Sequence, residues 1–372
     1  MTFWRTMIGG GLLTGAAHAA PGIGLQTPVT SVAHEIYDLH NLLVIIATTI
    51  FVGVLVAMFY AIVKHRKSAG HEAKHFHENT TVEVIWTVIP LLILVGMAWP
   101  ATRAVLHQKQ TRGEDMTIKI TGYQWKWRYD YLDAGMGFMS NLGTPRDAIY
   151  KTGTKGEHYL LEVDQPLVVP TGKRIRLLLT ANDVIHAWWV PALGVKQDAI
   201  PGFVRDAWFK VDKPGIYRGQ CAELCGRDHA FMPIVVDARS PADYEKWVAQ
   251  KQKTLAASAD DPNKTWTLKD LVARGETVYQ QNCAACHQPN GQGIPGTFPP
   301  LAGSPIATKN RAAHLDIVIN GSRRNPAMAA WGKVLNDTEI AAVITYERNA
   351  FGNNTGDVVQ PKDIKAARGG KA

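Results

Sequence analysis

The sequence has little cysteine, with four residues in a chain of 372. All four fall inside two short patterns, Cys221-x3-Cys225-x3-His229-x2-Met232 and Cys283-x-x-Cys286-His287. No thiol is left over for a structural disulfide, which excludes a fold held together by disulfide bridges. The two patterns instead indicate two redox centres, one of copper and one of haem, in a chain that carries electrons.

Lysine and arginine are absent from residues 20–63. Residues 41–63 and 84–102 carry no charge at all, and each stretch approaches the ~20 residues that a membrane-spanning helix needs. The loop between them is basic, with Lys64, Arg66, Lys67 and Lys74. The positive-inside rule places this loop in the cytoplasm and everything after about residue 106 outside. We therefore expect a two-pass hairpin at residues 31–106 in a bacterial inner membrane, with both metal patterns on the periplasmic side.

The first residues have the features of a secretory signal peptide. Arg5 precedes a short apolar stretch, and Ala17-His18-Ala19 has the small-residue pattern that signal peptidase cuts. We therefore exclude residues 1–19 from the fold. Residues 71–75 match H-E-x-x-H, a zinc-binding pattern when it lies on a helix. Because this segment is short, charged and without an apolar helix to shield a metal, we interpret it as a solvated loop.

Residues 107–247 hold β-branched and aromatic runs broken by glycine, proline and asparagine, which indicates an antiparallel sandwich or barrel. The expected strands are Thr117–Tyr131, Tyr159–Val163, Arg174–Thr180, Ala207–Val211, Ile216–Gln220 and Pro233–Asp237. Residues 248–265 are polar and indicate a linker.

A helical domain is expected at residues 266–350. Its predicted helices are Leu268–Asn282, His314–Asn320 and Thr338–Asn349. The basic, glycine-rich residues 351–372 are expected to form a flexible tail. Much of the net charge of +8 lies in this tail and in the cytoplasmic loop, so the charge does not indicate nucleic-acid binding.

The first cysteine pattern concentrates soft ligands that suit copper. Zinc would more typically need C-x2-C pairs or further histidine and cysteine. A simple blue-copper site needs two histidines, one cysteine and a weak methionine. This loop has one cysteine too many for that, so two bridging sulfurs and two metals fit it. The remaining imidazole should come from another strand, and His186 is the best candidate.

The second pattern, Cys283-x-x-Cys286-His287, is the c-type haem attachment motif. Its two thiols add to the haem vinyl groups, and the adjacent histidine ligates iron. A thioredoxin-like redox pair is the alternative for a bare C-x-x-C, but the following histidine and the non-cytosolic location argue against it. After His287 the chain contains one further histidine, His314, and one methionine, Met328, as candidates for the sixth iron ligand.

Residues 31–240 resemble subunit II of the haem-copper cytochrome c oxidases. The resemblance lies in the two apolar spans, the cysteine loop and the segments Glu83–Thr87, Gly122–Trp127 and Gly194–Gly202. One departure is Phe203, where many relatives have arginine. Residues 266–350 resemble small class I cytochromes c. The two resemblances together imply a multidomain membrane protein with a transmembrane helical hairpin, an all-β cupredoxin-like barrel and an all-α cytochrome c domain.

The resemblance implies a binuclear copper centre, CuA. Its implied ligands are the bridging thiolates, two imidazoles, a weak thioether and a backbone carbonyl, from Cys221, Cys225, His186, His229, Met232 and Glu223. The Glu223 carboxylate would reach a magnesium ion shared with the catalytic subunit. The resemblance to class I cytochromes c implies that Met328 ligates the haem iron. It also implies that the segment Phe298–Leu301 supports the proximal histidine through a backbone carbonyl.

Two further roles are implied by the resemblance. Trp125 is similar to the surface tryptophan through which electrons reach CuA, although it could equally pack in the barrel. Glu83 is similar to the carboxylate at the entrance of a proton path on the cytoplasmic side. A carboxylate at a helix N-terminus is also favoured by the helix dipole.

We therefore expect subunit II of a proton-pumping cytochrome c oxidase of the respiratory chain. Electrons would pass from an external donor, a cytochrome c, through haem c to CuA and on to subunit I. The uncharged spans lack the histidines that haem a and an oxygen site need, so we expect oxygen chemistry in subunit I, accompanied by subunit III. A quinol oxidase subunit would lack the copper ligands. The CuA-bearing subunit of a nitric oxide reductase is the remaining alternative.

Overall fold

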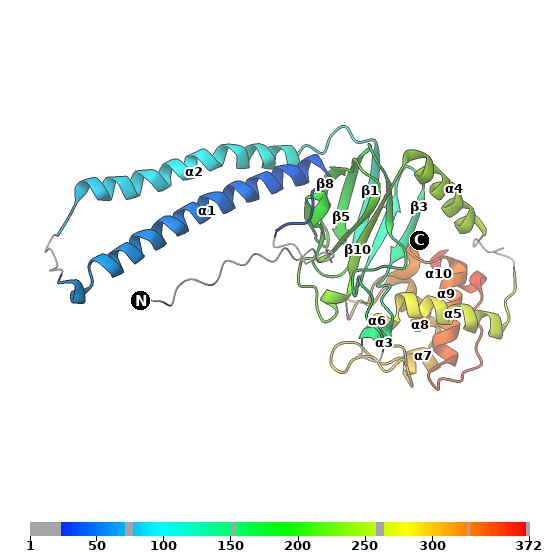
Figure 1. The fold of residues 1–372 in the computed structure, drawn as a ribbon. Coiled ribbons are helices and arrows are strands. Elements are labelled where there is room, and N and C mark those ends of the chain that lie inside the picture. The colour runs from blue at the N-terminus through cyan, green and yellow to red at the C-terminus, as the bar shows by residue number, and fades with distance from the viewer. Residues whose placement is uncertain (1–23, 71–76, 150–152, 258–263, 326–327, 370–372) are drawn as a thin grey trace.

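The computed structural model describes residues 24–70, 77–149, 153–257, 264–325 and 328–369. The expected signal peptide and the H-E-x-x-H segment lie outside these residues. A long helical hairpin, a β-barrel and a helical domain follow one another along the chain (Figure 1).

The hairpin consists of helices α1 (Ser31–Lys64) and α2 (Thr80–Gln108), with a short 3-10 helix η1 (Lys67–Ala69) after α1. Both are long and apolar enough to cross a membrane, and their apolar windows are not buried within the described protein. They project away from the barrel (Figure 1). Both exceed the expected spans because polar turns extend them, with Thr30 and Asn79 capping their N-termini.

The outer ends of both helices are fixed to the barrel. The Thr30 hydroxyl donates to the Leu193 carbonyl at 2.8 Å. His107 Nδ1 lies 2.9 Å from a Glu35 carboxylate oxygen, which joins α2 to α1. The Trp208 indole N–H donates to the His107 carbonyl at 3.3 Å. These contacts hold the barrel at a defined position against the start of α1 and the end of α2.

The barrel has two five-stranded sheets, in the orders β3-β2-β1-β5-β8 and β4-β10-β9-β6-β7. The strands are β1 (Met116–Tyr123), β2 (Lys126–Tyr131), β3 (Met136–Ser140), β4 (Leu167–Pro170), β5 (Arg174–Ala181), β6 (His186–Val190), β7 (Val195–Ala199), β8 (Arg205–Lys210), β9 (Gly215–Cys221) and β10 (Pro233–Arg239). Short helices α3 (Arg146–Ile149), η2 (Pro191–Leu193) and η3 (His229–Phe231) lie between strands. Two pairs, β1–β5 and β4–β10, are parallel, so the barrel is not purely antiparallel as expected.

Two strand predictions were wrong. The run Thr117–Tyr131 is a hairpin of β1 and β2, because Gln124 and Trp125 form a turn inside it. Residues 159–162 lie in turn and irregular structure, and Leu160 has a φ of 63°, which a strand does not allow. Large aromatic side chains fill the space between the sheets, among them Trp127, Tyr129 and Trp188.

Helix α4 (Pro241–Ala257) takes up residues 248–257 of the expected linker. The helix continues because Trp247 packs against the barrel, 5.4 Å from the Tyr131 ring between centroids. The connection to the next domain is therefore shorter than its polar composition indicates.

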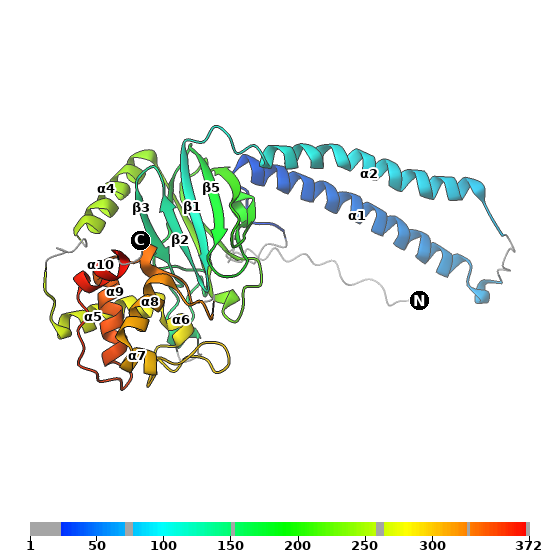
Figure 2. The same ribbon diagram turned by 180° about the vertical axis from the view of Figure 1, so that it is seen from behind.

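The C-terminal domain consists of α5 (Leu268–Asn282), α6 (Ala284–His287), α7 (Pro305–Lys309), α8 (Arg311–Asn320), η4 (Trp331–Lys333), α9 (Asp337–Asn349) and α10 (Pro361–Gly369). Figure 2 shows this domain below the barrel, with α5, α8 and α9 packed together. Helices α5 and α9 cross closely at Gly275, where a Cβ atom would lie 2.1 Å from the Ala342 carbonyl oxygen.

The expected flexible tail at residues 351–372 was also wrong for the residues described, because 351–369 pack on the domain. Val359 and Ile364 are fully buried. The Arg348 guanidinium of α9 donates to Asp357 at 2.8 Å. The basic composition of this segment masked two apolar anchors, and the helical domain extends to residue 369.

Replacing Ile364 by alanine tests this packing. We expect Ile364→Ala to lower the free energy of unfolding of the C-terminal domain by about 2–5 kcal/mol, the cost of emptying a buried site. Denaturant unfolding of the full chain in detergent, followed by haem absorbance, measures it. Lys362→Ala, on an exposed position of the same helix, is the control and should stay within about 0.5 kcal/mol of the wild type. Equal midpoints for the two variants would contradict the packing role.

Candidate metal centres

The pairing of β6 with β9 brings the first group of expected copper ligands together. Trp188 lies opposite Cys221 in this antiparallel pair, which places His186 near the end of β9. His186 is fully buried. The ligand atoms of His186, Cys221 and Cys225 all lie within 4.8 Å of one another.

The loop between β9 and β10 supplies the other expected ligands. The two sulfur atoms of Cys221 and Cys225 lie 3.9 Å apart. Cys225 Sγ is 3.5 Å from His229 Nδ1 and 3.4 Å from Met232 Sδ. The Glu223 carbonyl oxygen lies 3.3 Å from Cys221 Sγ. All six residues expected around a copper centre therefore form one cluster.

His186 is arranged as a metal ligand. Its Nε2 lies 2.8 Å from an Asp183 carboxylate oxygen. Its Nδ1 is buried and has no hydrogen-bond partner among the described residues. A proton held on Nε2 by the carboxylate leaves a lone pair on Nδ1, as is typical of metal-bound histidines. The donor set fits copper.

The cysteine pair is also poised electrostatically. A hydrogen bond from the Cys225 thiol lowers the pKa of Cys221 below its usual range. The same pairing raises the pKa of Cys225. The pairing therefore favours ionisation of Cys221 over Cys225, and a thiolate is the form of cysteine that binds a soft cation.

Asp183 is a site residue that the sequence reasoning missed. Its other carboxylate oxygen accepts the backbone N–H of Gln124 at 2.7 Å. It therefore connects the His186 imidazole to the turn that carries Trp125. An aspartate three residues before a ligand histidine is the signal that would have indicated it.

The haem motif lies where α5 meets α6. Cys283 caps α5, and α6 carries Cys286 and His287. His287 Nδ1 lies 2.9 Å from the Pro299 carbonyl oxygen, which confirms the predicted support of the proximal histidine. This contact leaves Nε2 available to ligate a haem iron, so these residues fit a c-type haem.

Met328 and His314 have different surroundings. Met328 is half-buried and packs against the same apolar cluster as Cys283. His314 of α8 is buried, and its Nε2 lies 2.7 Å from a Glu347 carboxylate oxygen. His314 Nδ1 is buried without a hydrogen-bond partner among the described residues, so both side chains stay candidates for the sixth ligand.

Trp125 is 6% exposed and lies in the apolar cluster of the barrel. Phe298 of the C-terminal domain packs edge-on against it, at 6.1 Å between ring centroids. Its indole N–H donates to the Cys225 carbonyl at 3.3 Å. Trp125 therefore lies between the copper loop and the haem domain.

Two expected carboxylates lie at the surface. Glu83 is in the first turn of α2, and its carboxylate accepts the backbone N–H of Asn79 at 3.4 Å. This contact supports the helix N-terminus. Glu223 is exposed on the copper loop, and Phe203 is exposed on the β7–β8 connection.

Comparison with known proteins agrees with this geometry. Residues 116–239 match the family model of the cytochrome c oxidase subunit II periplasmic domain, and residues 18–103 match that of its transmembrane domain. A probable cytochrome c oxidase subunit 2 of Rickettsia bellii is 40% identical over 235 residues, covering 63% of this chain and 86% of that protein. The chain belongs to the cytochrome c oxidase subunit II family. A probable subunit 2 of Rickettsia prowazekii is 39% identical over 233 residues, or 62% of this chain and 73% of that one.

Further similarities cover single parts of this subunit II. Residues 270–346 match the family model described as cytochrome c oxidase, cbb3-type, subunit III. The solved periplasmic domain of subunit II of cytochrome oxidase from Bradyrhizobium japonicum is 43% identical and covers 39% of this chain and 99% of its own, with a TM-score of 0.35.

Family membership establishes several of the expectations. The chain is a two-pass membrane subunit of a haem-copper oxidase that works with subunit I. Its domains imply CuA and haem c, and the cluster of His186, Cys221 and Cys225 fits CuA. The nitric oxide reductase alternative is not favoured by these relatives.

Substituting Asp183 tests its contact with His186. We expect Asp183→Asn to lower copper affinity by about tenfold to a hundredfold, the usual cost of losing a carboxylate behind a ligand histidine. Copper content after dialysis against a graded chelator, with the copper EPR signal, measures it. Asp212→Asn, at an exposed acid of the same domain, is the control. Wild-type copper retention in Asp183→Asn would contradict this role.

Proposed function

We propose that this subunit receives electrons from an external cytochrome c at haem c and passes them through CuA to the oxygen-reducing site of subunit I. The covering of Trp125 by Phe298 is the observation that carries the proposal. A soluble donor has no access to a tryptophan that the haem domain already covers. The external donor therefore delivers its electron to the haem domain.

The contacts between the two centres support this order. Cys286 of the haem motif and Phe298 pack against the apolar cluster of the barrel, which also contains Trp125 and both copper-loop cysteines. Trp125 in turn contacts the Cys225 carbonyl. When bound, haem c and the copper pair supply reversible one-electron chemistry, with no bond made or broken.

The chain's own residues hold and shield these groups. We assign Cys221, Cys225, His186, His229, Met232 and the Glu223 carbonyl to CuA, and Cys283, Cys286, His287 and Met328 to haem c. Burial of both copper-loop cysteines excludes water from the centre. Asp183 orients His186, and the Pro299 carbonyl orients His287. Methionine as the sixth iron ligand raises the haem potential.

Several further assignments belong to the proposal. The exposed Glu223 carboxylate shares a magnesium ion with subunit I, and Glu83 marks the entrance of a proton path. The metal domains lie on the periplasmic side of a bacterial inner membrane, and subunit III completes the complex. The units are a signal peptide at 1–19, a hairpin at 31–106, a copper domain at 107–257 and a cytochrome c domain at 266–369.

Replacing Trp125 tests the relay. In the purified complex, we expect Trp125→Phe to leave haem reduction by cytochrome c unchanged. Transfer from haem to copper should slow measurably, because the smaller ring loses the hydrogen bond to the Cys225 carbonyl and changes the packing against Phe298. Stopped-flow absorbance resolves the two steps, with Trp247→Phe, in α4, as the control. If copper in the wild-type complex is reduced before haem, or is not reduced after haem during turnover, the proposed order of electron transfer is wrong.

Replacing Met328 tests the haem ligation. We expect Met328→Leu to convert the haem to a high-spin form and to lower its reduction potential, because the thioether ligand is lost. Optical spectra and a redox titration measure both effects. His314→Gln should leave the ligation unchanged. High-spin haem in His314→Gln and low-spin haem in Met328→Leu would exchange the two assignments.

A further inference from the structure

Lys126 is a buried lysine that the copper site does not use. It begins β2, directly after Trp125, and its side chain is almost completely buried, at 3% exposure. Its ammonium group donates to the Gln281 carbonyl at 3.1 Å and to the Asn282 carbonyl at 3.0 Å. Both carbonyls belong to the cytochrome c domain, 155 and 156 residues further along the chain.

The position of these carbonyls suits a cation. Gln281 and Asn282 form the last turn of α5, just before Cys283. The last carbonyls of a helix have no partner within the helix and carry the negative end of its dipole. Lys126 therefore supplies hydrogen bonds to the unpaired carbonyl oxygens at the C-terminal end of α5, the helix that leads into the haem motif.

A second contact joins Lys126 to the loop that carries Met328. Its Nζ lies 4.7 Å from the centroid of the Trp331 ring, within cation–π range. Tyr123, which pairs in register with Lys126, also stacks on Trp331 at 6.1 Å between ring centroids. One barrel cation thus contacts the segments before Cys283 and after Met328.

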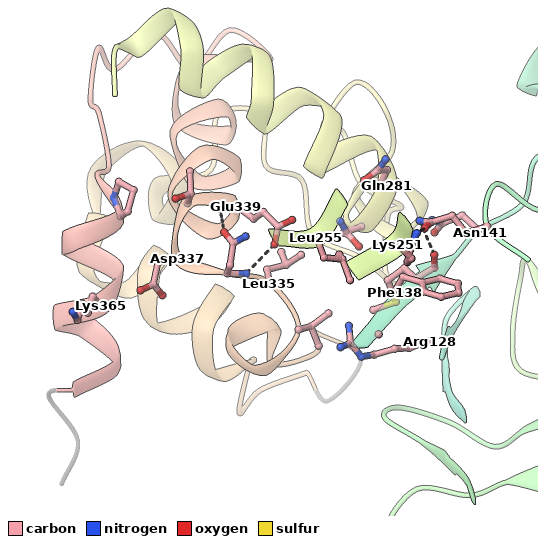
Figure 3. Close-up of a pocket in the computed structure, with 18 of the residues that line it drawn as sticks. Arg128, Phe138, Asn141, Lys251, Leu255, Gln281, Leu335, Asp337, Glu339 and Lys365 are labelled. Atoms are coloured by element: carbon pink, nitrogen blue, oxygen red, sulfur yellow. Dashed lines mark hydrogen bonds between the residues drawn. The ribbon is translucent and has the colours of Figure 1, made fainter. Parts of the chain in front are cut away.

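The rest of the boundary between the domains is partly open. A cavity of about 880 Å³ lies between Arg128 and Phe138 of the barrel and Leu335 and Asp337 of the cytochrome c domain (Figure 3). The contacts that Lys126 and Trp125 make with the cytochrome c domain lie beside the two metal sites. In a contact of this kind, a few buried groups carry most of the binding energy.

We propose that Lys126 is a positioning residue that anchors the cytochrome c domain on the copper domain and so fixes the haem motif against Trp125. The role rests on the relay proposed above. Lys126 carries no electron itself. It sets the geometry across which ferrous haem is oxidised and the copper pair is reduced by one electron.

Burial has a consequence for the charge of this anchor. Removal from water lowers the pKa of Lys126 to about 8, and the carboxylates of Asp183 and Asp164 oppose that shift. The carbonyl oxygens and the Trp331 ring favour the ammonium form, so near pH 7 the anchor is charged. Its hydrogen bonds are then of the stronger, charge-assisted kind.

Lys126→Met removes the charge and the donors while keeping an apolar stem. In the intact oxidase complex, we expect the docking equilibrium to weaken about tenfold to a hundredfold, the range for losing charged hydrogen bonds. Relaxation enhancement of the oxidised copper EPR signal by ferric haem should fall, and haem-to-copper transfer should slow. The shapes of the copper and haem spectra, and the rate of haem reduction by cytochrome c, should stay unchanged.

Two further variants complete the experiment. Lys126→Arg keeps the charge and the donors, and we expect it to restore most of the relaxation enhancement. Lys119→Met removes a lysine from the neighbouring strand β1, where it pairs in register with Asp130, and should behave as the wild type.

The outcomes separate this role from the relay itself. Wild-type relaxation enhancement and transfer rate in Lys126→Met would overturn the anchor and leave the relay standing. A wild-type complex in which copper does not follow haem would refute the relay. If Lys126→Met does not assemble, Lys126→Gln is measured in the same way. A partial loss of enhancement there supports the anchor, and full enhancement overturns it.

Discussion

The pairing of β6 with β9 is the interaction on which the metal chemistry of this chain depends. Without it, His186 and the cysteine loop are separated by more than 30 residues of sequence. The register that sets Trp188 opposite Cys221 brings an imidazole beside two sulfurs in the barrel interior. The loop from Cys221 to Met232 then closes the site. The cytochrome c domain packs beside this end of the barrel, where Trp125 contacts the same loop.

Several polar side chains are buried at this end of the barrel. The His186 imidazole and the Lys126 ammonium group are both removed from water, and each has a defined partner. Asp183 pairs with His186, and the last carbonyls of α5 accept hydrogen bonds from Lys126. A polar group inside a protein is costly unless it is paired, so these contacts specify geometry as well as contribute energy.

Much of the site could be predicted from the sequence, because the ligands cluster in two short patterns whose spacing reflects their chemistry. The helices Leu268–Asn282 and Thr338–Asn349 were also predicted within one residue of their ends. Lys126 could not be predicted in the same way. Its partners lie in the cytochrome c domain, and no local pattern encodes a contact across 155 residues. The tail beyond residue 350 was mispredicted because a few apolar anchors outweigh a basic composition once a neighbouring helix covers them.

The packing of α4 on the barrel has a consequence for the kinetics of the proposed electron transfer. Because α4 continues to Ala257 and α5 begins at Leu268, the connection is short, and an undocked cytochrome c domain stays close to its site. Its effective concentration is on the order of millimolar, however sparsely the oxidase is distributed in the membrane. In the proposed relay, reduction of the haem is a second-order reaction whose rate depends on the concentration of the external donor. Electron transfer from haem to copper is a first-order reaction within one oxidase complex.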